Sequence, residues 1–588
     1  MKKIFPAIAL VAIVFAVYAP ALRNDFVWDD TALVLRDPLI RSWRLIPEGF
    51  RHFLFTDATA SDFYRPIQRL TYTFDYALFV FRPAGYHLSN IVFHALTALA
   101  LLLLGRELLS LFGVEESKRN RIAFLAALAW AIHPLHSSAV VYVAGRADPL
   151  AAFFGFFGLY LGIRSFDASS RRRWFLLGIA GSCLLLSALS KETGIVFLLL
   201  WFALLLLKRK WKEFVPVTVT AVLVISIYLS LRLPAEHIPA PRFREPTPVL
   251  VRPIVAARAV TEYAGLILWP TNLHMDRDVE KRPETGPQIN KTYGFQLQTI
   301  LGILLIGGFV YWLIRSRKQN GAVFCCLIFA ILTYLPVSAL FSLNANIAEH
   351  WLYLPTAFLF LAIGLAISYL HIPTLLIGSS VAAWLLFLGA RTWIRTFDWK
   401  NQRTFLESTL ATGGDSARML INLAGLELRE GKLDSAKDHL HLALKKEPDQ
   451  PLAILNLATV AVRQDDFAAA HELLTRAMKV PFTKAKADEL MAVLDLRQSG
   501  LINLPRFQLA ARTSAGDWSI ERRYIQALDE SGATSEAIAE LNSCLSTQWY
   551  RAESWQYLSE LLTKAGRTAE ATQAQLFAKK YDVHLGEH

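Results

Sequence analysis

The sequence predicts an all-α protein, in which a polytopic helical membrane domain of about 11 spans is followed by an α-solenoid of short repeats. Two observations carry this prediction. Of the 588 residues, 54% are hydrophobic and only 19% are charged, and the mean hydropathy is +0.34, which is too apolar for a soluble or disordered protein. From residue 416 onward, amphipathic segments recur every 34 residues. We therefore expect a membrane domain over residues 1–400 and a repeat domain over residues 410–588.

Apolar runs mark the expected spans, because a helix needs about 20 apolar residues to cross the hydrocarbon core of a bilayer. Two neighbouring runs are separated only by residues 190–193, so they could form one bent helix, but basic residues on both sides of the pair favour two spans. The runs are residues 4–22, 87–112, 122–142, 149–166, 174–190, 194–207, 214–231, 296–314, 322–342, 353–370 and 374–392.

Basic clusters predict the orientation of the chain, because Lys and Arg are enriched in cytoplasmic loops. The first basic cluster directly follows residue 1. Further basic clusters occur at every second junction between the apolar runs, for example at residues 171–173 and 208–212. The N-terminus is then cytoplasmic, and an odd number of spans places everything after about residue 392 outside. The first run also resembles a signal peptide, with residues 19–21 as a candidate cleavage site. A signal-like start and short cytoplasmic loops favour a bacterial inner membrane, with the repeats in the periplasm.

The charge balance favours membrane lipid as a partner and argues against nucleic acid. Residues 1–400 hold 39 Lys and Arg against 24 Asp and Glu, whereas residues 401–588 hold 22 against 25. The excess positive charge therefore belongs to the apolar part, where it faces anionic lipid. Two long loops, residues 23–86 and 232–295, are expected on the outer side. Within the second, residues 254–269 are expected to form a helix that lies on or dips into the membrane.

Two registers of similar residues predict the repeats. The triplet Asn-Leu-Ala at residues 422–424 recurs at residues 456–458, and a second register aligns residues 524, 532 and 537 with residues 558, 566 and 571. Both spacings are 34 residues, which is the tetratricopeptide period. The stretch 484–515 is a degenerate repeat or a spacer, so we expect about four to five repeats. Such an array is a binding surface; the alternative is a packing cap on the membrane domain.

Charged and histidine side chains at the outer ends of the spans are the candidate site residues, because polar groups at membrane depth are costly and are functional candidates by default. His133 and His136 are three residues apart, which predicts one helix face for both. Asp29 and Asp30 follow the first span, where they could also simply cap a helix. The full set is Asp29, Asp30, Arg65, His133, His136, Arg146, Asp148, Lys191, Glu192, Glu349 and His350.

These side chains suit the transfer of a group from a lipid-linked phosphate. The leaving phosphate is an acceptable anion, which needs cations to stabilise it and no acid. The attacking hydroxyl needs one positioned base, and a single carboxylate suffices for displacement with inversion. Lys191 and Glu192 could instead be an ion pair with no further role. The two histidines lack a third and a fourth metal ligand nearby, so the sequence supports neither a divalent metal nor another cofactor.

Seven short strings occur in order along the chain. They begin at residues 26 (FVWDD), 64 (YRP), 85 (GYHL), 133 (HPLH), 145 (GRAD), 190 (SKETG) and 349 (EHWLYLP). Together with the repeats, they resemble the transmembrane and tetratricopeptide-repeat O-mannosyltransferase family, over nearly the whole chain. This family belongs to the GT-C superfamily of integral-membrane glycosyltransferases, so the resemblance implies a GT-C-like membrane domain.

The resemblance implies that an acidic motif in the first outer loop, here Asp29 or Asp30, supplies the catalytic base. We place Asp29 first because the motif begins there. The resemblance also implies a polyprenyl- or dolichyl-phosphate-linked sugar as the donor. Arg65, Arg146 and Lys191 are then the candidates for the donor phosphate, and the two histidines for lining the pocket. The repeats would hold a protein or glycan acceptor.

Two positions depart from the family pattern. Ser138 stands where the family usually has an acid, and His350 stands where it usually has Arg, which weakens a phosphate contact at neutral pH. Mannose as the sugar therefore does not follow from the sequence. Two rival functions stay open: a non-catalytic membrane scaffold or assembly factor that recruits partners through its repeats, and a lipid or sugar transporter, which would more often show paired halves than this chain does.

Overall fold

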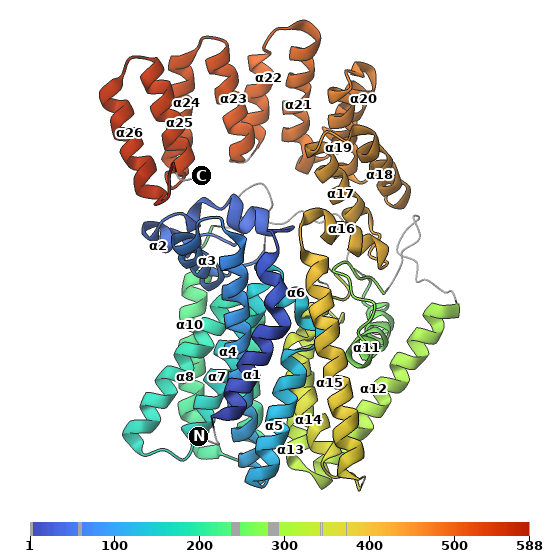
Figure 1. Ribbon diagram of the computed structural model, residues 1–588. Coiled ribbons are helices and arrows are strands. Elements are labelled where there is room, and N and C mark those ends of the chain that lie inside the picture. The colour runs from blue at the N-terminus through green and yellow to red at the C-terminus, as the bar shows by residue number, and fades with distance from the viewer. Residues whose placement is uncertain are drawn as a thin grey trace.

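The computed structural model describes residues 4–56, 62–236, 247–279, 293–341, 343, 345–371, 373–514 and 516–586. Parts of both predicted outer loops, and the first basic residues, lie outside this range. Every regular element of the described residues is a helix, and extended pairing is limited to two isolated bridges, His52 with Glu236 and Arg277 with Ile347. An upright bundle of long helices forms one layer, and a curved array of shorter helices lies across one end of it (Figure 1).

Each of the eleven predicted apolar runs forms a helix of the bundle. Residues 190–193 separate two helices, α8 and α9, as the flanking basic residues predict. By length and composition, seven helices of the described chain could each cross a membrane, or eight if one bent pair is a single span. The protein is thus an integral membrane protein. The bundle helices are α1 (Phe5–Tyr18), α4 (Pro83–Leu111), α5 (Glu116–Ala131), α7 (Ala147–Arg164), α8 (Ser170–Ser190), α9 (Val196–Leu207), α10 (Phe214–Arg232), α12 (Tyr293–Gln319), α13 (Gly321–Tyr334), α14 (Tyr353–Ile367) and α15 (Thr374–Thr396).

The bent pair corrects the prediction for residues 122–142. The helix α5 ends at Ala131, because Pro134 has no N–H group and cannot continue it. A 3₁₀ turn and the short helix α6 (Ser137–Val140) follow at an angle of 53° to α5. His133 and His136 therefore do not share a helix face, as their spacing predicted. They lie at the break, with their ring centroids 6.0 Å apart.

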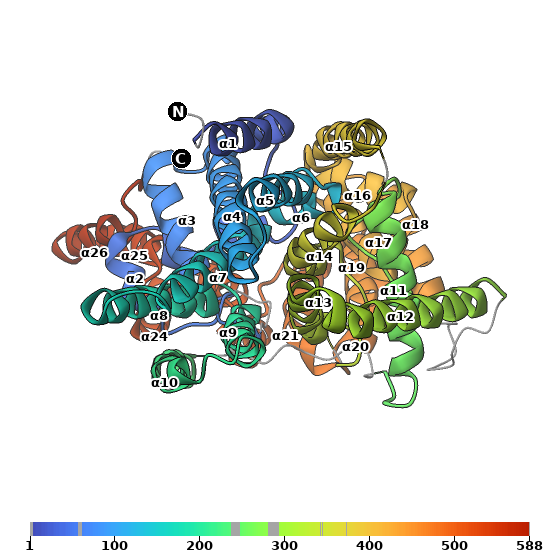
Figure 2. The ribbon, with the colours of Figure 1, turned by 90° about the horizontal axis from the view of Figure 1, so that it is seen from below.

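The two ends of the bundle differ in the residues that they carry. The basic turns gather at the end that holds the N-terminus, where Lys208 lies over the Phe112 ring and Arg173 pairs with Glu213 at 2.8 Å. The repeats lie at the opposite end (Figure 1). Large apolar side chains are exposed along α10, α12 and α15, which lie at the periphery when the bundle is seen along its length (Figure 2). These faces suit contact with lipid.

The first outer loop is folded rather than irregular. It contains α2 (Ile46–Gly49) and α3 (Pro66–Phe79), together with short 3₁₀ turns. The buried Arg69 side chain binds the Asp37 carboxylate at 2.9 Å and donates to four backbone carbonyl groups of residues 49–54, so one guanidinium group fixes the path of this loop. In the second loop, the helix expected at residues 254–269 is α11 (Arg252–Leu268). It packs on α12, where Gly302 leaves room for the α11 backbone.

The repeat array consists of helix pairs. Ala436 and Ala470, one period apart, are fully buried between the paired helices. Gly532 and Gly566 have φ angles of +88° and +75°, which glycine adopts without strain at the turn of each pair. The stretch expected as a degenerate repeat or a spacer, residues 484–515, contains a helix pair over its described residues, and the first helix of the pair is long. The array comprises α16 (Gln402–Ala411), α17 (Ala417–Arg429), α18 (Leu433–Lys446), α19 (Pro451–Arg463), α20 (Phe467–Ala477), α21 (Pro481–Ser499), α22 (Leu504–Thr513), α23 (Trp518–Glu530), α24 (Thr534–Thr547), α25 (Ala552–Lys564) and α26 (Thr568–Tyr581).

The start of the array contacts the bundle through hydrogen bonds and through buried apolar side chains such as Phe405; we call this contact the N-terminal dock. The segment of residues 24–30, here named the acidic loop, lies against the end of α15 and against α16. The Asn24 side chain donates to the Thr396 carbonyl group at 2.9 Å, and the Asp25 N–H group donates to the Lys400 carbonyl group at 2.9 Å. The acidic loop is thus fixed by residues at the border between the two predicted domains.

The end of the array contacts the first outer loop through apolar groups; we call this contact the C-terminal dock. Leu39 and Leu45 of the loop share a buried cluster with Tyr550 and Tyr581 of the array. Several hydrogen bonds accompany this cluster. The Tyr76 hydroxyl group donates to the Asp582 carboxylate at 2.7 Å, and the Ser42 hydroxyl group donates to the Lys580 carbonyl group at 3.2 Å. The Val583 N–H group donates to the Arg41 carbonyl group at 3.2 Å. The array therefore meets the same outer loop region with both of its ends.

Candidate active site

Asp30 is a buried carboxylate that fixes the acidic loop. Its Oδ2 atom accepts the N–H group of Val27 at 3.0 Å, and its Oδ1 atom accepts the N–H group of Ala144 at 2.7 Å. The second bond reaches the 3₁₀ turn Val143–Arg146 at the start of α7. Burial raises the pKa of Asp30 to about 8, although the backbone N–H groups oppose this rise. Both oxygens are engaged in holding the loop.

Asp29, its neighbour, is partly exposed. Its backbone N–H group donates to the Tyr142 hydroxyl oxygen at 3.2 Å. Removal from water raises the pKa of the Asp29 carboxyl group above its ordinary value, whereas a hydrogen bond with Tyr142 and the guanidinium groups of Arg418 and Arg65 oppose the rise. A carboxylate that is accessible, with a pKa shifted toward neutrality, has the properties of a general base.

Trp28 precedes this carboxylate in a strained conformation. Its φ angle is +51°, in the left-handed region that a bulky residue seldom adopts. Its N–H group donates to the Oε1 atom of Gln402 at 2.6 Å, its ring lies edge-on to Phe405, and the Arg418 guanidinium group lies 5.3 Å from the ring centroid. All three partners belong to α16 and α17.

A cluster of cations and carboxylates lies at the outer ends of the spans; we call it the cationic cluster. Arg65 binds Glu192 at 3.2 Å, and Arg232 lies 3.7 Å from the same carboxylate. Lys191 binds Asp148 at 2.6 Å. Three cations face two carboxylates, so the cluster carries a net positive charge that an anion could compensate.

Four of the sequence-predicted residues are therefore brought together in this cluster, and His350 lies within electrostatic reach of Lys191, Asp148 and Arg65. The guanidinium group of Arg65 also acts on the carboxyl group of Asp29.

Arg146, unlike the cations of the cationic cluster, is not available to bind a phosphate group. Its side chain is fully buried and binds the Asp75 carboxylate at 2.5 Å and the Asn90 amide oxygen at 2.6 Å. It also donates to the Tyr86 carbonyl group at 2.9 Å and to the Thr71 hydroxyl oxygen at 3.1 Å. The sequence suggested a phosphate contact for Arg146, but this geometry engages its guanidinium group inside the protein.

The two histidines at the break after α5 lie inside the bundle. The His133 ring contacts the Ile267 carbonyl oxygen at 3.0 Å, and the His136 ring lies 3.4 Å from the Thr356 hydroxyl group. Both rings are fully buried, and His136 packs on Tyr353. They line the interior next to α14 rather than an exposed pocket.

Glu349 belongs to a different group of charges from its neighbour in the sequence. Its Oε1 atom accepts from the Arg277 side chain at 3.2 Å and from the His274 N–H group at 2.7 Å, and its Oε2 atom lies 3.6 Å from Arg395. This buried carboxylate thereby ties the second outer loop to α15.

Metal ligation is limited among the side chains in the described part of the chain. No group of three or more His, Cys, Asp or Glu side chains in that part lies close enough together to hold a metal ion.

Sequence reasoning missed several partners of the site residues. Tyr142, which contacts Asp29, lies between two of the quoted strings, and Arg232 lies at the end of a span, where a basic residue is common. Gln402 and Arg418 lie beyond the expected border of the membrane domain. The FVWDD string could not predict the contacts of Trp28 with Gln402 and of Asp29 with Tyr142. Each of these contacts joins residues more than one hundred positions apart.

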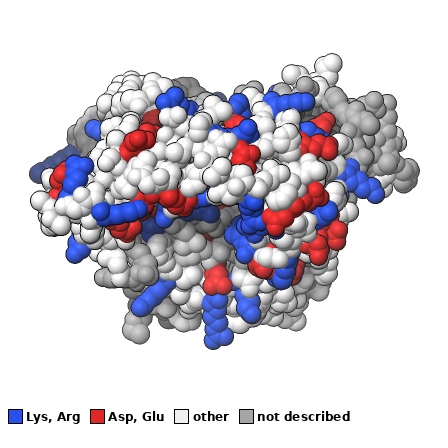
Figure 3. Space-filling model, turned by 90° about the horizontal axis from the view of Figure 1, so that it is seen from above, with Lys and Arg blue, Asp and Glu red and all other residues white. Residues whose placement is uncertain are grey.

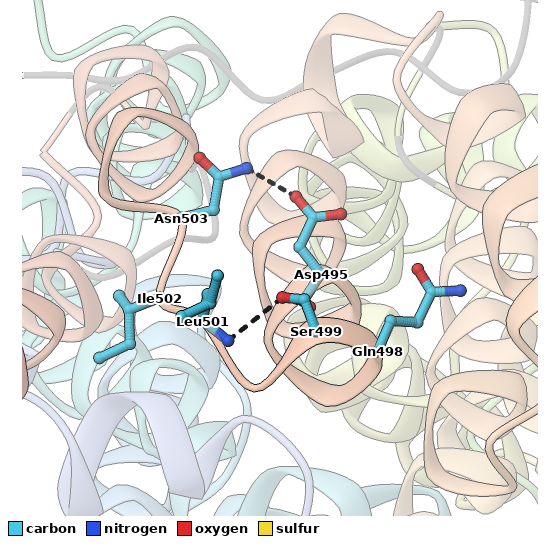
Figure 4. Close-up of a pocket in the computed structure, with 6 residues that line it drawn as sticks. All are labelled: Asp495, Gln498, Ser499, Leu501, Ile502 and Asn503. Carbon is cyan, nitrogen blue, oxygen red and sulfur yellow. Dashed lines mark hydrogen bonds between the residues drawn. The ribbon is translucent and has the colours of Figure 1, made fainter.

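The surface of the array offers two further observations. Viewed from above, the residues drawn in colour show positive and negative side chains interspersed over the array (Figure 3). A hollow lies at the turn between α21 and α22, where Asn503 donates to Asp495 at 2.7 Å and the Leu501 N–H group donates to Ser499 at 3.1 Å (Figure 4). These bonds close the turn itself, and the hollow lies far along the chain from the acidic loop.

Both the membrane-spanning part and the repeat array of the chain are similar to known proteins. A family model described as Tetratricopeptide repeat matches residues 405–494, which confirms the predicted repeat type there. The chain is 25% identical over 453 residues to Protein O-mannosyl-transferase F38B6.6 of Caenorhabditis elegans, covering 75% of this chain and 62% of that protein. It is 25% identical over 494 residues to Protein O-mannosyl-transferase TMTC3 of Homo sapiens, covering 76% and 52%.

The resemblance that the sequence strings predicted is thereby confirmed. The chain spans roughly half to three-fifths of the length of these curated relatives. Among solved structures, ArnT from Cupriavidus metallidurans bound to undecaprenyl phosphate is similar with a TM-score of 0.36 and 13% identity, covering 87% of this chain and 79% of that chain.

Proposed function

We propose that this relative of the protein O-mannosyl-transferases is an inverting glycosyltransferase of the membrane. It moves a sugar from a polyprenyl-phosphate-linked donor to a hydroxyl group of a protein or glycan. One observation carries the proposal: the described chain holds a partly exposed carboxylate, Asp29, and three cations, Arg65, Lys191 and Arg232, that face only two carboxylates. The names of the relatives support mannose as the sugar and a protein as the acceptor.

The reaction needs a base on one side of the anomeric carbon and cations on the other. Asp29 takes the proton of the acceptor hydroxyl group as its oxygen attacks the anomeric carbon. The bond from that carbon to the phosphate oxygen breaks, and its electron pair leaves with the phosphate. Arg65, Lys191 and Arg232 stabilise the departing anion, so no acid and no metal ion are required.

Asp29 is the better candidate for the base, and Asp30 is the better candidate for a positioning residue. Both oxygens of Asp30 accept backbone N–H groups, whereas Asp29 is the accessible member of the pair. The pKa of Asp29 lies above its ordinary value, which strengthens its carboxylate as a proton acceptor.

The array is proposed to hold the acceptor, because stacked helix pairs present a continuous binding surface. We further propose that the array faces the periplasm of a bacterial inner membrane. The basic turns lie at the end of the bundle opposite to the array, and Lys and Arg are enriched on the cytoplasmic side.

The experiment that tests the activity uses the full-length protein in nanodiscs with a panel of polyprenyl-phosphate sugars, each radiolabelled. Transfer to acceptor polypeptide is measured for the wild type, for Asp29→Asn and for Asp25→Asn. Asp25 is an exposed carboxylate of the same loop, so it provides a matched control. We expect Asp29→Asn to lower turnover by about 100-fold or more, and Asp25→Asn to change it by less than about twofold.

Two results would contradict the proposal. Unchanged transfer by folded Asp29→Asn would overturn the assignment of the base. Absence of transfer from every donor by the wild type would favour the scaffold function, in which the array recruits partners without catalysis.

The orientation is tested by cysteine labelling in intact cells. Ser546→Cys places a thiol on the exposed surface of α24, and Arg172→Cys places one in a basic turn. Both variants also carry Cys544→Ser, because the native Cys544 is a partly exposed free cysteine of the same helix. A membrane-impermeant maleimide is then expected to label the first variant in intact cells and the second only after permeabilisation. The reverse pattern would invert the proposed topology.

A further inference from the structure

Trp28 directly precedes Asp29, the proposed base. The backbone of Trp28 is in the left-handed region, which is unfavourable for a residue with a bulky side chain. Such a conformation persists only where the surroundings hold it. Asp30 holds the loop on one side of Asp29, through the N–H groups of Val27 and Ala144. On the other side, the holding groups come from the array.

Three side chains of α16 and α17 hold Trp28. Gln402 accepts its N–H group at 2.6 Å, Phe405 contacts its ring edge-on with centroids 5.2 Å apart, and Arg418 lies over the ring. Arg418 in turn binds Asp276 of the second outer loop at 2.6 Å, so its guanidinium group is itself held in place.

We infer that the first helices of the array form part of the catalytic unit, in which Gln402 and Arg418 act as positioning residues that hold Trp28 and thereby aim the Asp29 carboxylate. This inference rests on the proposed function. It assigns a second role to the array, beyond binding of the acceptor: the array completes the geometry of the base.

Arg418 also acts on the charge of the base. The groups that face Asp29 are Asp30, Tyr142, Arg65 and Arg418. A nearby guanidinium group favours the ionised carboxylate, so removal of Arg418 raises the pKa of Asp29 further. The acid limb of the kcat profile against pH, which reports ionisation of the base in the enzyme–substrate complex, then moves to higher pH.

The first experiment measures kcat and the donor KM of the full-length protein. Gln402→Ala removes the acceptor of the Trp28 N–H group, and we expect kcat to fall by about 10- to 100-fold with an unchanged donor KM. Gln402→Glu keeps an acceptor at the same place and restores kcat toward the wild type. Arg403→Ala is the matched control on α16, because Arg403 pairs with Glu407 and Glu430 and makes no described contact with Trp28.

The second experiment separates positioning from a purely structural role through the pH profile. Arg418→Ala is expected to shift the acid limb upward by about 0.5 to 1 pH unit, whereas Arg418→Lys keeps the charge and leaves the limb near its wild-type position. A loss of stability would lower the amount of active protein without moving the limb.

The outcomes distinguish this inference from the proposed function. If the wild type transfers sugar but Gln402→Ala keeps wild-type kcat, or Arg418→Ala keeps the wild-type acid limb, the positioning role is overturned while the transferase function stands. If the wild type transfers no sugar from any donor of the panel, the proposed function fails and the positioning role fails with it.

Discussion

The two docks of the repeat array differ in chemistry although both reach the first outer loop. At the N-terminal dock, hydrogen bonds and a guanidinium group surround Trp28 and the acidic loop, and the Trp28 ring also packs on Phe405. The C-terminal dock centres on a buried cluster of Leu and Tyr side chains, together with hydrogen bonds. Polar contacts are directional and set the position of a group, whereas apolar burial supplies stability with little directional demand.

This difference suggests a division of labour. The C-terminal dock fastens the array, and the N-terminal dock sets the geometry of the proposed base. If so, changes at the C-terminal dock alter stability far more than turnover per folded molecule, and changes at the N-terminal dock do the opposite. The predictions below test this contrast, from the largest expected effect to the smallest.

The largest effect concerns the pH dependence of stability, and it comes from Asp30, which lies outside both docks and binds the N–H groups of Val27 and Ala144. Unfolded Asp30 releases its proton near pH 4, but the folded carboxyl group has a pKa of about 8. Its contribution to stability is full below about pH 4 and is lost as the pH rises toward 8, by roughly 5 kcal/mol in total. We expect Asp30→Asn to remove this loss, measured as the difference between the two Tm curves over pH 4–8.

The exposed Asp25→Asn variant is the control for that prediction, and its Tm should follow the wild-type curve. Parallel curves for Asp30→Asn and the wild type would contradict it. Because the mutant amide can accept only one of the two N–H groups in the same way, a constant offset between the curves is expected; the slope is the test.

Next in size is the apolar burial at the C-terminal dock. Leu45 is fully buried there, so Leu45→Ala should cost about 3 kcal/mol of docking free energy. Limited proteolysis is expected to cut more rapidly near residues 548–552, while kcat per folded molecule falls by less than about threefold. Leu35→Ala, at a partly exposed leucine of the same loop, should change neither quantity. If Leu45→Ala lowered kcat as much as Gln402→Ala does, the proposed difference between the two docks would be wrong.

One hydrogen bond of the C-terminal dock comes third. Tyr76→Phe removes the hydroxyl group that donates to the Asp582 carboxylate at 2.7 Å, and we expect it to destabilise the dock by about 1 to 2 kcal/mol. The same proteolysis assay measures this, and the added cleavage should be smaller than for Leu45→Ala. Equal cleavage in the two variants would mean that the polar contact, not the apolar cluster, fastens the array.

The smallest effect is the salt dependence of the N-terminal dock. Arg418 is half exposed where it binds Asp276, so screening should weaken that pair by less than about 1 kcal/mol. At saturating donor, raising NaCl from about 0.05 to about 0.5 M should lower the wild-type kcat by up to about threefold. Arg418→Ala should lack this part of the response. An identical response in both proteins would exclude the pair as its source.

Most of the fold could be predicted because the signals are local. An apolar run forms a helix wherever it lies in the chain, and a 34-residue period fixes the helix pairs. The error at residues 122–142 is also local: the run was read by composition, and the proline at position 134 breaks it.

The site could be predicted only in part, because its contacts are not local. The sequence identified Arg146 as unusual but could not reveal Asp75, which lies more than seventy positions earlier and neutralises it. In the same way, Glu349 and His350 are neighbours in the sequence, yet the fold assigns them to different charge groups. The sequence shows which residues have side chains suited to a site. The contact partners of these side chains depend on which helices pack together.

The C-terminal dock has a consequence for the order of events during synthesis. Asp582 and the Tyr76 hydroxyl group that it binds are separated by 506 positions. At about 5 to 20 residues per second, the first outer loop emerges roughly 25 to 100 s before its partner exists. During that interval the partners of Leu39 and Leu45 have not yet been synthesised, so the nascent protein exposes an apolar patch on this loop until its last repeat is made.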